Sequence, residues 1–147
     1  MTSTTHPTTV STATHRAVYG VMGGLAGGLV FGILMQTVDM IPMVAQLVGS
    51  DSIPVGWIVH LAISSFIGAS FAILLGSLAK TLIASALIGM AYGVVWWVLG
   101  ALIIMPAQLG MPGFELNTTA WQSLTGHLLY GLVLGVVFSQ LARRDHD

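Results

Sequence analysis

Long apolar stretches, separated by single charged residues, dominate this chain. Asp, Glu, Lys and Arg are absent from four stretches, residues 17–38, 52–79, 81–114 and 116–142. Each stretch reaches the roughly 20 residues that an α-helix needs to cross a bilayer. The pattern therefore predicts four membrane-spanning helices, at about 17–37, 54–77, 81–104 and 120–142.

The composition is typical of a membrane protein and argues against several functions. Apolar residues make up 55% of the chain and charged residues 6%, whereas a soluble domain has about a quarter charged residues. The chain has no cysteine, so it cannot itself supply disulfides, thiolate ligands or the ligands of an iron–sulfur cluster. It has no basic patch for nucleic acid, no nucleotide motif and no nucleophile with a plausible base, and we do not expect an enzyme.

The few charges predict the orientation. Four cations flank the predicted spans on one side, Arg16, Lys80, Arg143 and Arg144, and the opposite loops carry only the acids Asp39, Asp51 and Glu115. Because cytoplasmic loops are enriched in Lys and Arg, both termini are expected in the cytoplasm. We expect a disordered tail over residues 1–16, a transmembrane domain over 17–142 and a short tail over 143–147.

The two halves of the chain resemble each other. His60 and His127 are each followed by Leu at once, by Gly eight residues on and by Phe eleven residues on. Gly20 and Gly24 recur as Gly89 and Gly93. The expected fold is all-α, a polytopic membrane four-helix bundle built from two parallel two-helix repeats, residues 17–79 and 81–142. A two-fold axis along the membrane normal would relate the repeats.

Glycines recur at four-residue spacing in the first predicted span, at Gly20, Gly24, Gly28 and Gly32. Such a glycine zipper lets helix backbones approach closely, which drives helix association in lipid. The stripe could pack within the bundle or form a surface for a second copy. The expected partners are the lipid bilayer and either further copies of the chain or the subunits of a larger membrane complex.

Three interpretations of the histidine pair remain open, because a titratable side chain inside a membrane needs a reason. His60 and His127 could bond neighbouring helices in a purely structural role. They could ligate a b-type haem or a metal in the bundle core. They could also belong to a proton or substrate path of a small transporter.

Methionines cluster with prolines in both outer loops, which are expected to form short interfacial helices or re-entrant turns. Met40 and Met43 lie in the first loop and Met105 and Met111 in the second. Thioethers and imidazoles both bind copper, so these residues and the two histidines are candidate metal ligands. Alternatively, the methionines fill irregular gaps where helices meet loops.

Three segments resemble those of a known group of proteins. They are Trp57-Ile-Val-His60, Gly100-Ala-Leu-Ile-Ile-Met-Pro106 and Gly126-His127-Leu-Leu-Tyr130-Gly131. They resemble small prokaryotic four-helix membrane proteins of unknown function with a Gly-His-x-x-Tyr-Gly element. The resemblance implies a bacterial or archaeal plasma (inner) membrane. The leading hypothesis is a small non-catalytic membrane subunit that holds haem or metal between the histidines. The alternatives are a scaffold subunit and a transporter component.

Overall fold

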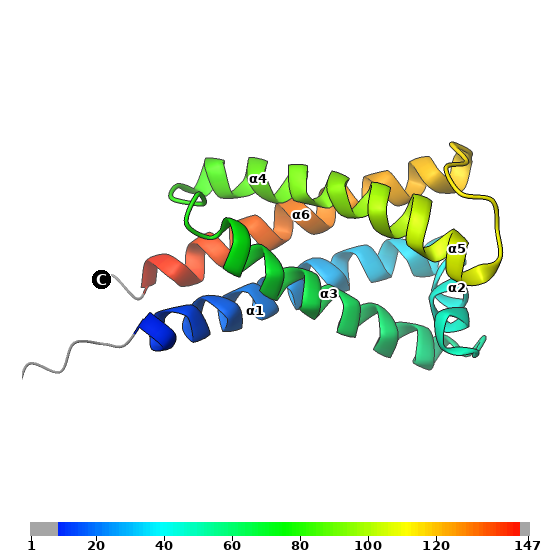
Figure 1. Cartoon of the computed structure of the whole chain (residues 1–147), viewed down its shortest axis with the longest axis horizontal. Coiled ribbons are helices and arrows are strands. Elements are labelled where there is room, and N and C mark those ends of the chain that lie inside the picture. Colours follow the sequence, from blue (N-terminus) through cyan, green and yellow to red (C-terminus); the bar gives the residue numbers. More distant parts are fainter. Residues whose placement is uncertain (1–8, 145–147) are drawn as a thin grey trace, which may run out of the picture.

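The computed structural model describes residues 9–144, with side chains from Ala13 onward, and four long helices dominate it (Figure 1). In chain order the elements are α1 (Thr9–Thr37), α2 (Ile41–Ala45), the 3-10 helix η1 (Gln46–Val48), α3 (Ile53–Leu75), α4 (Leu82–Trp96), the π-helix η2 (Trp97–Ile104), α5 (Met105–Leu109) and α6 (Thr118–Arg144). Figure 1 shows the start of α1, the α3–α4 connection and the end of α6 at one end of the bundle, with α2 and α5 at the other.

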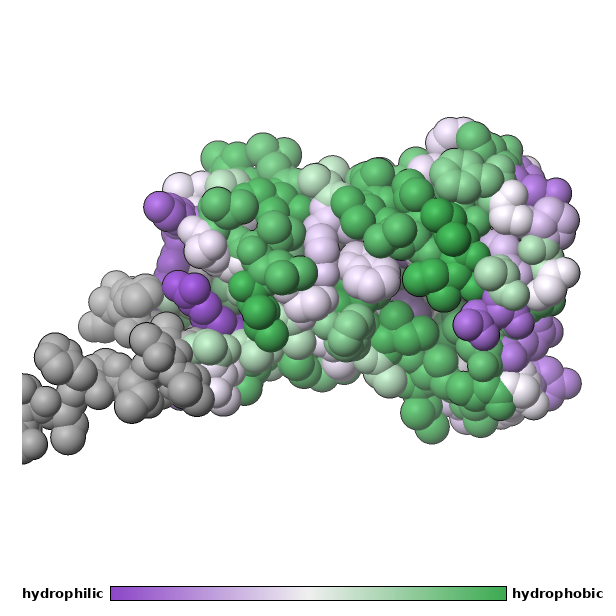
Figure 2. All heavy atoms as spheres, in the orientation of Figure 1, coloured by the Kyte–Doolittle hydropathy of each residue, from purple (hydrophilic) through white to green (hydrophobic). Residues whose placement is uncertain are grey.

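The prediction of four membrane spans is confirmed. The helices that are long and apolar enough to cross a bilayer are Ala13–Thr37, Ile53–Leu75, Leu82–Leu109 and Thr118–Arg144. Figure 2 shows a flank that is largely hydrophobic between two ends where the hydrophilic residues gather. The protein is therefore a small multi-pass membrane protein, and its outward-facing Leu, Ile and Phe side chains are placed to contact lipid.

The helix ends differ from the predicted spans in three places. α1 begins at Thr9, so residues 9–16, expected in a disordered tail, are helical, and residues 1–8 lie outside the described part. No Gly or Pro interrupts that segment, so the helix can continue beyond the apolar span. Arg143 and Arg144 likewise belong to α6, and the third span continues through η2 to Leu109. Of the two forms expected for these loops, short helices and re-entrant turns, the structure has short helices, α2 and α5.

Two helix pairs make backbone-to-backbone contact at glycines. A methyl group at Gly20 or Gly24 of α1 would collide with the carbonyls of Gly68 or Ser64 of α3. In the second half of the chain, a methyl group at Gly89 of α4 would collide with the carbonyl of Gly131 on α6, and the reverse holds too. Both pairs thus use the close approach that small residues permit in lipid.

The glycines of α1 face two different helices. Gly23 and Gly27 lie against the carbonyls of Leu134 and Tyr130 on α6, on a face of α1 next to the one that contacts α3. Both sets of glycines are buried within one chain. The interpretation of the stripe as a surface for a second copy is therefore wrong, because α3 and α6 already cover it.

The contacts between the two halves are uneven. α1 packs along much of α6, whereas α3 and α4 meet at only a few residues. A two-fold axis relating the halves would exchange these two pairs of helices. Under exact two-fold symmetry the two pairs would pack alike, and they do not. The internal duplication and its symmetry axis therefore stay predictions.

The glycine contacts predict a contrast between two substitutions. Gly131→Ala should destabilise the protein by about 1–3 kcal/mol, because the added methyl collides with the backbone of α4. Gly100→Ala should be neutral or stabilising, because a methyl group there would meet no neighbouring helix or side chain within 4 Å. Unfolding of both variants in mixed micelles checks this, and equal stabilities would contradict the packing described.

Candidate functional site

His60 of α3 is buried in the bundle and bonds the backbone of α1. Its side chain is 6% exposed, and its Nε2 atom lies 2.9 Å from the carbonyl oxygen of Gly28. A carbonyl can only accept, so Nε2 is the nitrogen that donates in this bond. A methyl group at Gly28 would press on the side chain of Ser64, which lies one turn from His60, so glycine keeps α1 close to α3 at this level.

His127 of α6 bonds within its own helix. Its Nδ1 atom lies 2.8 Å from the carbonyl oxygen of Ser123 and 3.3 Å from the hydroxyl of the same residue. The ring of Phe31 contacts both imidazoles, with centroid distances of 5.4 Å to His60 and 4.8 Å to His127. The two predicted site histidines thus come together around one phenylalanine, which was not among the predicted site residues.

The Gly-His-x-x-Tyr-Gly element places α6 against the other three long helices. Gly126 makes room for Phe31 of α1, and the carbonyl of His127 lies against Gly93 of α4. The hydroxyl of Tyr130 donates to the carbonyl of Ser64 on α3 over 2.7 Å. Together with the contact of Gly131 on α4, these interactions give each named residue of the element a packing role.

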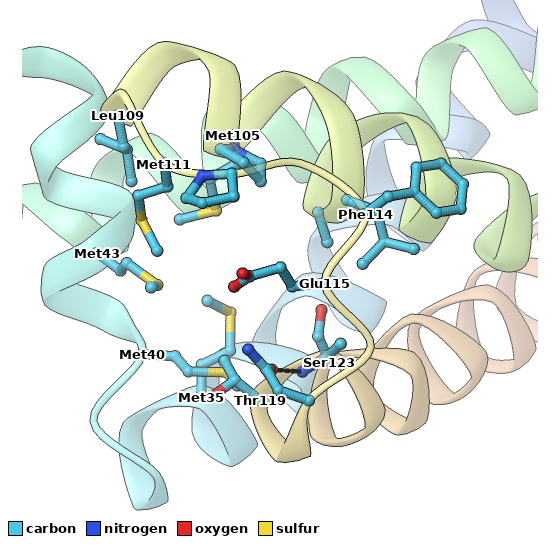
Figure 3. Close-up of a pocket in the computed structure, with 16 residues that line it drawn as sticks. Met35, Met40, Met43, Met105, Leu109, Met111, Phe114, Glu115, Thr119 and Ser123 are labelled. Carbon is cyan, nitrogen blue, oxygen red and sulfur yellow. Dashed lines mark hydrogen bonds between the residues drawn. The ribbon is translucent and has the colours of Figure 1, made fainter.

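The four predicted methionines line one cavity at the end of the bundle that carries α2 and α5. The cavity has a volume of about 140 Å³, and its lining also includes Met35, Glu115 and Ser123. We call it the methionine cavity and define it by Met35, Met40, Met43, Met105 and Met111. Figure 3 shows these side chains arranged around a common space, with the carboxylate of Glu115 reaching into it.

Tight turns bring the methionines together from distant parts of the chain. The amide of Met40 donates to the carbonyl of Met35 over 2.9 Å, which turns the chain from α1 into α2. The amide of Met111 donates to the carbonyl of Pro106 over 2.9 Å and closes α5 at Gly110, which has a φ of 68°. Left-handed backbone of this kind suits glycine, since it has no Cβ.

A second bond folds the following segment back over the π-helix. The amide of Phe114 donates to the carbonyl of Leu102 over 2.9 Å. This bond holds the loop before α6 against η2. Glu115 is the next residue of that loop after Phe114. π-helical segments are rare and are often found at functional sites.

The histidines and the methionine cavity are neighbours. Ser123 lines the cavity and also bonds His127, so this histidine lies directly behind the cavity wall. His60 is not among the lining residues. The structure therefore groups Met40, Met43, Met105 and Met111 around one space, and it groups the two histidines separately around Phe31.

Harder metal ligands do not gather anywhere in the described residues. Within 9–144, no three His, Asp or Glu side chains lie close enough together to hold a metal ion. The donors that do converge are thioethers, joined by one carboxylate. Two members of the cavity were not predicted as site residues, Met35 and Glu115. The isolation of Glu115 between two uncharged stretches was a signal in the sequence that could have identified it.

Comparisons with curated proteins and with solved structures found no match. One family model does match, over residues 14–147. This range includes every candidate site residue and, apart from Ala13 at the start of the first, all four candidate membrane helices. The chain therefore belongs to DUF6789, a family of unknown function.

Proposed function

We propose that this membrane protein binds Cu(I) in the methionine cavity. The observation that supports this proposal is the convergence of five of the eight methionines on one cavity, from the end of α1 and from the two connections that carry α2 and α5. Thioether sulfur is a soft, neutral ligand that favours Cu(I) over hard cations such as Mg²⁺ and Ca²⁺. The carboxylate of Glu115 would offset the positive charge of the bound ion.

A gap-filling role for the methionines accounts less well for this arrangement. Methionine fills irregular spaces because its side chain is flexible, and a filled space leaves no cavity. Here the side chains surround about 140 Å³ instead of occupying it. The buried Met35 and Met40 form one wall, while Met111 is 45% exposed and offers a route by which an ion could enter.

The contacts of His60 and His127 favour a structural role over haem ligation. Axial ligation would require Phe31 to leave its place against both rings. It would also require His60 to bind through Nδ1 or to give up its bond to the Gly28 carbonyl. The proposal therefore assigns the metal to the methionines, and the histidines to the packing of α3 and α6 on α1.

The proposal includes an orientation. The cations Lys80, Arg143 and Arg144 would lie in the cytoplasm, and the methionine cavity would open on the outer face of the plasma membrane. A subunit role in a larger complex is compatible with this proposal, because the proposed metal ligands all come from one chain.

Copper affinity tests the proposed site. Purified protein should bind one Cu(I) per chain under reducing conditions, in competition with a chromogenic Cu(I) chelator. Met43→Leu combined with Met111→Leu should weaken binding at least about tenfold, which corresponds to about 1.4 kcal/mol. The change to Leu keeps the volume of the side chain and removes the sulfur.

Met90→Leu is the matched control, because Met90 lies on α4 away from the cavity. It should leave the affinity unchanged. The proposal fails if the wild-type protein competes no better than the double variant, or if Met90→Leu weakens binding as much. His60→Ala should leave the copper stoichiometry unchanged in any variant that remains folded.

Orientation is tested with single cysteines, which the cysteine-free chain makes direct. Gln108→Cys at the end of α5 should react with a membrane-impermeant maleimide in intact cells. Ser77→Cys in the α3–α4 connection should react only after the membrane is permeabilised. The reverse labelling pattern would place the methionine cavity in the cytoplasm.

A further inference from the structure

A second cavity lies at the opposite end of the bundle, and three of the four Lys and Arg residues of the chain line it. These are Arg16 of α1, Lys80 of the α3–α4 connection and Arg143 of α6. The cavity has a volume of about 290 Å³. This value is close to the lower end of the range of small-molecule pockets, about 300–1,000 Å³. We call it the basic cavity.

Backbone bonds fix the segment that carries the central cation. The amide of Ala79 donates to the carbonyl of Leu75 over 3.3 Å, and the hydroxyl of the buried Ser85 donates to the carbonyl of Ala79 over 3.1 Å. The amide of Lys80 donates to the carbonyl of Leu78 over 2.9 Å. These bonds hold Lys80 beside the ends of α1 and α6 and so bring the three cations to one rim.

No acid in the described residues lies near this rim. Asp39, Asp51 and Glu115 all belong to the outer connections, at the far end of the long helices. A helix of 20 residues is about 30 Å long, which is several times the Debye length of about 8 Å at physiological salt. The cations therefore converge without a compensating charge from residues 9–144, and Asp145 and Asp147 lie outside this range.

The walls of the basic cavity combine polar and apolar groups. Phe138 and Ala79 supply buried apolar surface, at 1% and 8% exposure. The hydroxyl-bearing Ser77 and Ser139 also line the cavity. Cations and hydroxyls suit a phosphate group, while apolar walls beside them suit the glycerol and the first carbons of an acyl chain.

We propose that the basic cavity binds the phosphate headgroup of an anionic phospholipid. The apolar lining and the position at the end of membrane-spanning helices favour a lipid over a free phosphate ion. Basic pockets between membrane helices on the cytoplasmic side are suited to such headgroups. This inference shares the orientation given under the proposed function and is otherwise independent of the methionine cavity, which lies at the other end of the bundle.

The experiment titrates the purified full-length protein in mild detergent with phosphatidylglycerol and follows bound lipid by native mass spectrometry. Phosphatidylcholine with the same acyl chains is the zwitterionic comparison. We expect one phosphatidylglycerol to bind at least tenfold more tightly than phosphatidylcholine. Lys80→Gln and Arg143→Gln should each remove most of this preference.

Arg144→Gln is the matched control, since it removes the same charge from the adjacent position outside the lining. It should retain the preference for phosphatidylglycerol. Arg16→Gln supplies a third test from a separate helix if either of the other variants fails to fold, as judged by thermal unfolding.

Three results would overturn the proposal. Equal affinity for the two lipids would mean that the protein carries only nonspecific annular lipid. An equal loss in Arg144→Gln would mean diffuse attraction to the charged surface instead of a site. Displacement of phosphatidylglycerol by millimolar inorganic phosphate, with equal binding of the ion alone, would make the cavity a site for a free anion.

Discussion

The close approach of helix backbones at glycine is the contact on which the rest of this structure depends. Lipid is as apolar as the side chains it surrounds, so burial of apolar surface does little to hold membrane helices together. In this protein Gly20 and Gly24 join α1 to α3, while Gly89 and Gly131 join α4 to α6. Any side chain at these positions would separate the backbones.

α6 then connects the two helix pairs. Tyr130 reaches across the bundle to the carbonyl of Ser64, and Phe31 fills the space beside Gly126. The histidines lie at the same level, where each satisfies a backbone carbonyl. Burying a polar ring inside a membrane without a hydrogen-bond partner is energetically unfavourable. Each imidazole has a backbone carbonyl as its partner, so this penalty is avoided.

The two ends of the bundle carry different chemistry because the loops differ. At one end α2, α5 and the segment before α6 fold inward and surround a space with thioethers. At the other end the connection between α3 and α4 is short. Its Lys80 lies near Arg16 of α1 and Arg143 of α6 around the basic cavity. The central layer of glycines and aromatic rings separates the two cavities, and neither contains a residue of the other.

The membrane spans could be predicted from the sequence because a bilayer requires long uncharged stretches, and no tertiary contact changes that requirement. Short helices were one of the two forms predicted for the loops that carry α2 and α5, where Pro42 and Pro106 accompany the methionines. Glu115 stands out in the sequence as a lone charge, and Met35 lies close to Met40 and Met43 along the chain. The convergence of these residues with Met105 and Met111 could not be predicted, because it depends on how two loops fold over one another. The π-helix η2 could not be predicted from the hydrophobic pattern. It contains Leu102, whose carbonyl accepts the hydrogen bond from the amide of Phe114.

The partners of each glycine could not be predicted either. Spacing of four residues marks one face of a helix, but Gly23 and Gly27 lie on a second face that packs on α6. Likewise, the matched positions of His60 and His127 predicted that they would lie at one level of the bundle. The ring of Phe31 between them depends on the rotation of α1, which a repeat pattern does not specify.

X-ray absorption at the copper edge of the Cu(I)-loaded protein tests the central claim most directly, because it identifies the atoms bound to the metal. The account predicts a first shell of sulfur, to which the carboxylate of Glu115 adds at most one oxygen. A shell dominated by imidazole nitrogen would contradict it, because the metal would then be held by the histidines and not by the methionine cavity.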